Sequence, residues 1–328
     1  MVRFGIIGTN FITDRFIAGG KLCEGFAVRA VYSRTMEKAR KFAAKYGVEQ
    51  VYDRLEDLAE SREIDAVYIA SPNYCHADQA AQMLRAGKHV LVEKPATANA
   101  REWEELCRIA RENNVILLEA MRSVFLPEYT AIRENLHKLG TIRRATLSYC
   151  QYSSRYDKFK NGIIENAFRP ELCNGSMMDI GVYCINALID LFGAPKAVDG
   201  NCLKMHNGVD GAGTITANYG DMQAEVLYSK ITNSFNASEI QGEKGCMLIQ
   251  ELPNPTHIEI VYNTREREDL GISASEQNMQ FEVREFIRLV EEKDHEAEAA
   301  YAARTLAALE LMDAARAKME IVFPNDQK

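Results

Sequence analysis

A lysine, a carboxylate and a phenol are the residues of this sequence whose types and spacing best suit proton transfer. Lys94 ends the strand-like run KHVLVEK and is followed by Pro95. Asp179 and Tyr183 are four residues apart, so on a helix they share one face. The three groups form an acid/base set if they meet at one reacting hydroxyl. Taken singly, Lys94 reads equally as a surface lysine, and the other two as an ordinary helix start.

A second group of residues indicates a dinucleotide site. The first strand-like run leads into Gly8-Thr9-Asn10-Phe11-Ile12. A pyrophosphate needs a tight turn, close backbone approach and free N–H groups at a helix N-terminus. The glycine pattern of such turns would place glycines at 8, 10 and 13, and only Gly8 is present. We expect Asn10 to stand in for the second glycine, because asparagine tolerates a left-handed backbone, and Thr13 to loosen the packing. An ordinary strand–loop–helix turn would give the same local pattern.

The end of the second strand indicates which coenzyme binds. An NAD site usually has an acidic residue there, which holds the ribose 2′-hydroxyl. Here the sequence reads Ser33-Arg34, with Lys38 one helical turn further on. Ser33 can donate to a phosphate, and the two cations can pair with its charge. We therefore predict NADP, with NAD still possible; the alternative is a solvent-facing helix start.

The remaining predicted cofactor contacts follow other strands of the same sheet. Ligands of open α/β sheets bind beyond the carboxyl ends of the strands. We therefore add the residues after the third and fourth buried strands, and one near the end of the domain, to the cofactor site: Ser71, Pro72, Asn73, His76, Glu93, Lys94, Pro95 and Arg122.

The strands and helices that must position these residues follow one pattern in residues 1–121 and another in residues 122–328. In residues 1–121, strands near 2–7, 26–33, 64–71, 88–95 and 115–121 alternate with helices near 11–24, 35–46, 74–86 and 99–113. This alternation predicts an α/β Rossmann domain with a doubly wound parallel sheet. In residues 122–328 there are seven strand-like runs between 143 and 262, and short turns separate several of them. Two helices (275–292, 297–317) and a last strand (319–323) follow. We predict an α+β domain with a large open, mostly antiparallel sheet and helices on one side.

Composition limits the class of protein. The chain has 328 residues, 47% of them apolar and 26% charged, with a net charge of −8. That charge argues against a nucleic acid as the main partner, and no run of about 20 apolar residues predicts a membrane span. The eight scattered cysteines include no CxxC and no Cys/His cluster. We expect reduced, mostly buried thiols, a cytoplasmic location and no structural metal.

The motifs in order resemble the Gfo/Idh/MocA (glucose-fructose oxidoreductase / inositol dehydrogenase) family. The residues that carry the resemblance are GIIGTNFI (5–12), YSR (32–34), ASPNYCH (70–76), GKHVLVEKP (87–95), EAM (119–121) and MDIGVY (178–183).

The resemblance implies roles for these residues. Lys94 is expected to contact both the nicotinamide ribose and the substrate hydroxyl, and Pro95 to follow a cis bond. Tyr183 is expected to transfer the hydroxyl proton, and Asp179 to orient the substrate. The tyrosine variant is similar to the NADP-using dihydrodiol/D-xylose dehydrogenase branch. The implied activity is hydride transfer between NADP(H) and a sugar, polyol or related secondary alcohol or carbonyl.

Three departures and two alternatives remain. Asn10 replaces a glycine, Cys173-Asn174-Gly175 replaces a triple glycine, and Val124 stands where that branch has an arginine, although Arg122 is close. The substrate therefore stays unnamed. A non-catalytic NADP-binding regulator and an NAD-dependent glycoside hydrolase are the alternative functions.

The polar, aromatic stretch 150–174 predicts either a loop at the pocket mouth or a solvated connection. We expect a homodimer through the second sheet, because broad apolar faces usually find a partner.

Overall fold

The computed structural model describes residues 1–327, and the chain divides into two compact units. The first unit contains Met1–Arg122 and Glu276–Leu306, and the second contains Ser123–Ser275 and the chain from Ala307 onward. We had predicted a single break, with all residues from 122 to 328 in the second domain. The structure instead returns residues 276–306 to the first unit.

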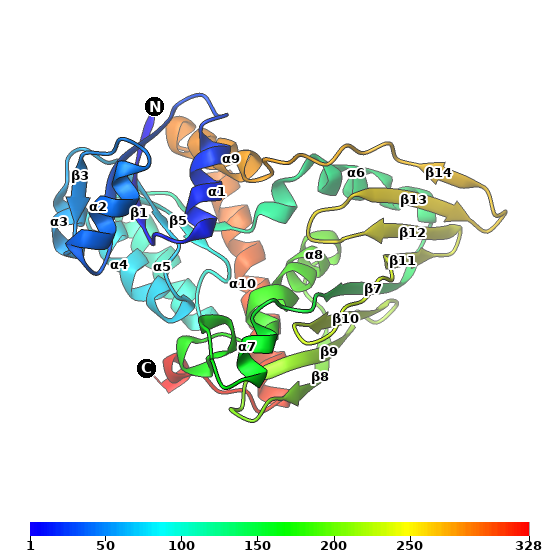
Figure 1. Ribbon diagram of the computed structural model, residues 1–328. Coiled ribbons are helices and arrows are strands. Elements are labelled where there is room, and N and C mark those ends of the chain that lie inside the picture. The colour runs from blue at the N-terminus through cyan, green and yellow to red at the C-terminus, as the bar shows by residue number, and fades with distance from the viewer. Residues whose placement is uncertain (328) are drawn as a thin grey trace. The chain divides into compact units, whose positions relative to one another are not determined.

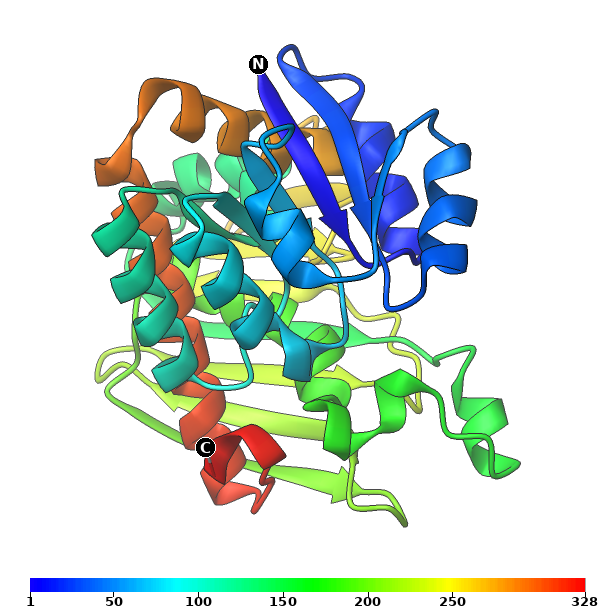
Figure 2. The same cartoon turned by 90° about the vertical axis from the view of Figure 1, so that its left-hand side faces the viewer.

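The first unit is built on a six-stranded parallel sheet. Its order is β3-β2-β1-β4-β5-β6; Figure 1 labels β1, β3 and β5, and Figure 2 shows the two dark-blue strands β1 and β2 side by side. Wholly apolar β4 lies inside the sheet and is buried along its length, as expected for a strand covered on both faces. The neighbours β1 and β4 mark the point where strand order reverses, where ligands of such sheets bind. The predicted Rossmann architecture is confirmed. The strands are β1 (Val2–Ile7), β2 (Phe26–Tyr32), β3 (Gln50–Tyr52), β4 (Ala66–Ile69), β5 (His89–Glu93) and β6 (Leu117–Ala120).

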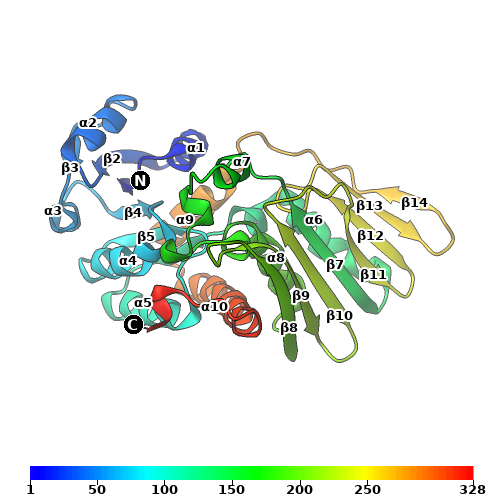
Figure 3. The ribbon, with the colours of Figure 1, turned by 60° about the horizontal axis from the view of Figure 1, so that its bottom comes forward.

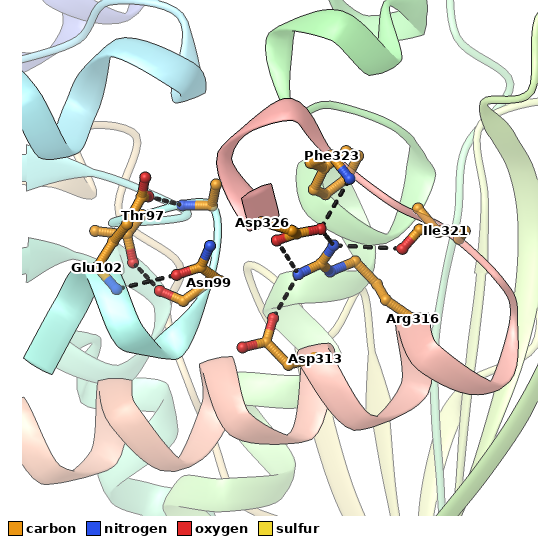
Figure 4. Close-up of polar contacts among 9 residues, drawn as sticks. Thr97, Asn99, Glu102, Asp313, Arg316, Ile321, Phe323 and Asp326 are labelled. Carbon is orange, nitrogen blue, oxygen red and sulfur yellow. Dashed lines mark hydrogen bonds and ion pairs between the residues drawn. The ribbon is translucent and has the colours of Figure 1, made fainter. Parts of the chain in front are cut away.

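Two helices of this unit begin at capping residues that are visible in the sequence. Thr35 caps α2 and accepts from the backbone N–H of Lys38. Asn99 caps α5 and accepts from the N–H of Glu102, as Figure 4 shows. Such caps satisfy N–H groups that the helix itself leaves without a partner. The helices are α1 (Phe11–Gly20), α2 (Met36–Ala44), α3 (Leu55–Glu60), α4 (His76–Arg85) and α5 (Ala100–Asn113).

Two late helices complete the first unit. Helix α9 (Met279–Glu292) packs on α1 and β1. Its Phe286 ring lies 5.7 Å from that of Phe4. Helix α10 (His295–Lys318) begins in this unit, where the carbonyl of Ala302 accepts from the Trp103 indole at 3.0 Å. The sequence predicted both helices, but a helical pattern does not say which sheet a helix will cover.

The second unit is built on an eight-stranded sheet, as predicted. Its order is β14-β13-β12-β11-β7-β10-β9-β8, and only the β7–β10 pair is parallel. Burial alternates along the strands: Ala145, Leu147 and Val226 are buried, whereas Thr146 and Glu225 are half-exposed. Figure 3 shows the strands side by side with α8 against one face. The strands are β7 (Ile142–Cys150), β8 (Ala197–Lys204), β9 (Asp210–Asn218), β10 (Gln223–Ser229), β11 (Ser238–Gly242), β12 (Gly245–Gln250), β13 (His257–Tyr262) and β14 (Arg267–Asp269); the helices within the unit are α6 (Pro127–Asn135), α7 (Tyr156–Lys160) and α8 (Val182–Phe192).

The predicted last strand, 319–323, is wrong. Glu320 has a left-handed backbone, with φ at 53°, which interrupts an extended run. The Arg316 guanidinium donates to Asp313, Asp326 and the carbonyl of Ile321 (Figure 4), and it lies over the Phe323 ring. These contacts fold the segment back on α10 instead of pairing it with a sheet.

The cysteines and the apolar character of the helices bear on two further expectations. All eight cysteines are free thiols, of which Cys23, Cys173 and Cys184 are buried and five are half-buried. The expectation of mostly buried thiols was therefore too strong. Within residues 1–327, no helix has the length and apolar character needed to cross a membrane.

Candidate functional site

The turn between β1 and α1 brings backbone close to backbone. Gly8 has a φ of 106°, and a Cβ there would overlap the carbonyl of Ala70 at the end of β4. Only glycine fits this position without displacing the neighbouring strand end. Thr13 is buried, and its hydroxyl donates to the Gly8 carbonyl at 2.8 Å. Thr13 therefore fastens the turn rather than loosening it, contrary to our expectation.

Asn10 stands at the second glycine position for a different reason than predicted. Its backbone is extended, with φ at −106°, so the expected left-handed conformation is wrong. The side chain instead caps α1: its oxygen accepts from the N–H of Ile12 at 3.0 Å, and its amide donates to the Ala70 carbonyl at 2.8 Å. Asn10 is exposed, as is Phe11, at the N-terminus of α1. The local arrangement fits a pyrophosphate, because a helix N-terminus and a backbone that only glycine permits meet there.

Ser33, Arg34 and Lys38 surround the end of β2. The Ser33 N–H donates to the Tyr52 carbonyl at 3.1 Å, which holds the turn in place. Arg34 and Lys38 are exposed. The Arg34 guanidinium lies close enough to Tyr32 and Tyr74 to oppose the rise in the pKa of both phenols. This edge of the sheet therefore offers a hydroxyl and two accessible cations, a donor set suited to a phosphate.

The loops after β4 and β5 are joined through His76. Its Nε2 lies 2.9 Å from the Ser71 carbonyl oxygen, and its Nδ1 lies 3.0 Å from that of Pro95. The ring is 1% exposed, and burial lowers the pKa of His76, so it is neutral and donates to one of the two carbonyls. His76 was predicted as a cofactor contact. Its burial favours an indirect role, in which it fixes the two loops.

Lys94 is half-buried at the end of β5, and the Lys94–Pro95 bond is cis, as the resemblance implied. The preceding residue, Glu93, is almost fully buried. It accepts from the Tyr68 hydroxyl at 2.6 Å and from the Lys94 N–H at 3.2 Å. Glu93 thereby orients the backbone from which Lys94 projects.

A buried carboxyl cluster lies behind Lys94, and we did not predict it. It contains Glu93, Glu119 of β6 and Glu282 of α9, with the charge of Arg122 acting on Glu93 and Glu282. Burial raises the pKa of all three carboxyls. Within residues 1–327, neither oxygen of Glu282 has a hydrogen-bond partner. In the sequence, Glu282 is one of several acids on an amphipathic helix, so no signal distinguished it.

In the second unit, Asp179 lies in a π-helical turn, Met177–Gly181, which runs directly into α8. Such turns are frequent at functional sites. Tyr183 lies in the first turn of α8 and is 8% exposed, with its ring 5.9 Å from that of Tyr149. The turn is anchored by Asp210, which accepts from the Met177 N–H at 2.7 Å. A Cβ on Gly175 would overlap the Asp210 carboxylate.

Sequence reasoning also missed Lys230, which follows β10. It is 3% exposed and forms an ion pair with Asp179. The only sequence signal was its place directly after a strand, which many surface lysines share.

The segment 150–174 is more ordered than the loop or solvated connection that the sequence suggested, and its place at a pocket mouth stays a prediction. It contains α7 and short 3₁₀ turns, and it has a small core of Phe159, Ala167 and Phe168 against Val209. Its Gln151 and Ser153 N–H groups donate to the carbonyls of Ser229 and Lys230. It is therefore a packed substructure attached to the end of β10.

The structure thus places the predicted residues in two groups. The first unit holds the cofactor residues and Lys94, and the second holds Asp179 and Tyr183. The approach of Lys94 to Tyr183 stays a prediction.

Two family models match the chain. One, described as an oxidoreductase family with an NAD-binding Rossmann fold, matches residues 2–121. The other, a GFO/IDH/MocA C-terminal domain, matches residues 131–248.

Similar proteins include several dehydrogenases. A scyllo-inositol 2-dehydrogenase (NADP⁺) of Bacillus subtilis is 46% identical over 327 residues, which is 100% of both chains. A trans-1,2-dihydrobenzene-1,2-diol dehydrogenase of Mus musculus is 31% identical over 81% of this chain and 79% of its own. Among solved structures, a 3-ketoreductase of Actinomadura kijaniata, in complex with NADP and TDP-benzene, has a TM-score of 0.87. It is 23% identical and covers 98% of this chain and 99% of its own, which supports the fold alone.

Proposed function

Since the chain belongs to the Gfo/Idh/MocA family of oxidoreductases, we propose that it transfers a hydride between NADP(H) and a secondary alcohol of a cyclic polyol. The observation that carries this proposal is the 46% identity, over the whole length of both chains, to an NADP⁺-dependent scyllo-inositol 2-dehydrogenase. The substrate class we propose is the inositols and the ketones formed from them.

The residues of the first unit fit the coenzyme. Gly8, Asn10 and the N-terminus of α1 would hold the pyrophosphate, and Ser33, Arg34 and Lys38 the 2′-phosphate. When bound, NADP⁺ supplies the hydride acceptor at its nicotinamide ring. The absence of an acidic residue at 33 or 34 supports NADP over NAD.

We assign the transfer of the substrate hydroxyl proton to Tyr183 and Lys94. In the oxidation direction, the bound coenzyme would take the hydride of the carbinol carbon, and Tyr183 or Lys94, acting as the base, would take the proton of the hydroxyl oxygen. A new C=O bond replaces the O–H bond. The Asp179 carboxylate accepts a hydrogen bond from a neighbouring hydroxyl and thereby fixes which carbon faces the coenzyme.

A spectrophotometric screen tests the proposal. The purified protein is incubated with NADP⁺ or NAD⁺ and a panel of scyllo-inositol, myo-inositol, D-xylose, D-glucose and a trans-dihydrodiol, and the appearance of reduced coenzyme is followed at 340 nm. We expect the highest kcat/KM for an inositol with NADP⁺. Turnover confined to the aldoses or the dihydrodiol would refute the polyol assignment. Coenzyme binding with no turnover in either direction would favour a non-catalytic regulator.

We further propose that the protein is a cytoplasmic homodimer. Eight free thiols are typical of a reducing compartment, which supports the cytoplasmic location.

The outer face of the second sheet supports the dimer. Helices of the same unit cover the other, buried face of this sheet. The outer face carries the half-exposed side chains of Thr146, Leu227, Leu248 and Val261. That face is more polar than we expected, because Arg144 and Glu225 pair across it. Light scattering should give twice the chain mass, and Leu248→Glu should give the single chain mass. A monomer in the wild type would refute this assembly.

A further inference from the structure

Lys230 is a buried cation that the chemistry above does not use. It is 3% exposed and follows directly after β10. Its backbone is held on both sides: the N–H donates to the Gly211 carbonyl at 2.9 Å, and the carbonyl accepts from the Ser153 N–H at 2.9 Å. The side chain therefore leaves a fixed point of the sheet.

The surroundings of the Lys230 ammonium are specific. It forms an ion pair with Asp179 and lies 5.2 Å from the centre of the Phe168 ring. Asp210 is near enough for the Lys230 charge to oppose the rise in its pKa. A lysine is almost never this buried unless it is paired. The ion pair with Asp179 thus offsets part of the cost of burying the Lys230 charge.

The two partners differ in exposure. The Lys230 side chain is 4% exposed, whereas that of Asp179 is 28% exposed. The ammonium therefore lies on the protein side of the carboxylate, and the carboxylate reaches toward solvent. A carboxylate held from behind by a fixed cation keeps one orientation, and its accessible edge can accept a hydrogen bond from a bound molecule.

We propose that Lys230 is a positioning residue, which holds the Asp179 carboxylate in the orientation that accepts a hydroxyl group of a neutral polyol. This inference rests on the proposed function. It also gives the segment 150–174 a role, because Phe168 belongs to the small core of that segment and forms one wall around the ammonium.

Three variants test the position of Lys230. Lys230→Met removes the charge but keeps a similar length, Lys230→Arg keeps the charge, and Lys138→Met breaks an ion pair with Glu268 elsewhere in the second unit. We expect Lys230→Met to raise KM for the polyol and to lower kcat/KM on the order of 10²-fold, because the partly buried Asp179 carboxylate loses its ion pair with Lys230. KM for NADP⁺ should stay within about twofold, since coenzyme contacts lie in the first unit. Lys230→Arg should keep most of the wild-type kcat/KM for the polyol. Lys138→Met should have the same kcat/KM as the wild type.

A double-mutant cycle separates positioning from a general effect on folding. If Lys230 acts through Asp179, then Lys230→Met should change kcat/KM little in an Asp179→Asn background. Additive effects, or an unchanged polyol KM in Lys230→Met, would overturn the role of Lys230 while wild-type turnover leaves the proposed function standing. If Lys230→Met does not fold, Lys230→Arg takes its place in the cycle, because a positioning role predicts that any change it makes in the polyol KM is lost in the Asp179→Asn background. Absence of polyol turnover by the wild type would overturn both proposals.

Discussion

Lys94 projects from a strand end that several buried groups hold rigid. The Tyr68 hydroxyl fixes Glu93, Glu93 accepts from the Lys94 N–H, and the carbonyl of Pro95 meets the His76 ring. The backbone from which the Lys94 side chain projects is thus held in place by these contacts. A group placed in this way suits proton transfer to or from a bound hydroxyl.

The first prediction concerns Lys94 and Tyr183. Lys94→Ala and Tyr183→Phe should each lower kcat on the order of 10²-fold or more, because each removes a group that exchanges the hydroxyl proton. Both variants should still bind NADP⁺, as measured by fluorescence titration. Tyr149→Phe is the matched control, because its ring lies against Tyr183. Near-normal turnover in both variants would remove these residues from the reaction.

The second prediction concerns Arg34. Its exposed guanidinium is expected to pair with the 2′-phosphate, so Arg34→Ala should lower kcat/KM for NADP⁺ by about 10- to 100-fold. The value for NAD⁺, which lacks that phosphate, should change little. Arg40→Ala, on the same helix α2, serves as the control. An equal loss with both coenzymes would mean that Arg34 acts on the fold and not on the phosphate.

Residue types that carry chemistry were visible in the sequence, whereas their buried partners were not. Lys94, Asp179 and Tyr183 stand in recognisable motifs. Lys230 and Glu282 become distinctive only when the chain folds, because burial is what makes a lysine or glutamate unusual. Asn10 lies directly before the predicted first helix, but its conformation was explained wrongly, since capping and left-handed backbone are both common uses of asparagine.

At the scale of elements, two glycines hold the two groups of residues in place. Gly8 lets β1 turn against the end of β4, and Gly175 lets the π-helical turn approach Asp210. The substitutions Gly8→Ala and Gly175→Ala introduce the same single methyl group into different units. Each serves as the control for the other.

The third prediction is that these two variants separate coenzyme binding from substrate binding. Gly8→Ala should raise KM for NADP⁺ at least tenfold with a smaller change for the polyol, because it displaces the pyrophosphate turn. Gly175→Ala should do the reverse, because moving Asp210 moves the turn that carries Asp179. Thermal melts would check that both variants fold. Parallel losses for both ligands would show that neither effect is local.

Periodicity explains which elements could be predicted. Strands with alternating burial, such as β7 and β10, and the apolar strands of the parallel sheet were found within a few residues. The run 319–323 alternates in the same way, but the contacts of Arg316 with Asp313 and Asp326 hold it on α10. The alternation of apolar and polar residues within 319–323 does not predict these contacts.

At the scale of the whole molecule, buried carboxyls couple folding to pH. Burial raises the pKa of Glu93, Glu119 and Glu282 above the ordinary value of 4.5, and that of Asp210 to about 7. A carboxyl whose pKa is raised in the folded state holds its proton more tightly there than in the unfolded chain. Its contribution to stability is complete below the unfolded pKa and is lost as the pH rises toward the folded pKa.

The fourth prediction isolates Glu282. Neither of its oxygens has a hydrogen-bond partner within residues 1–327, so Glu282→Gln removes the titration without breaking an observed contact. The free energy of unfolding should be similar for variant and wild type near pH 4.5. Above that pH the variant should become more stable by up to about 1.4 kcal/mol per pH unit, until the raised pKa is reached. Urea unfolding from pH 5 to 8 measures the difference, with Glu292→Gln, at an exposed position of the same helix, as control. A constant difference across this range would mean that Glu282 is ionised in the folded protein, and its burial would then need a cation beside it.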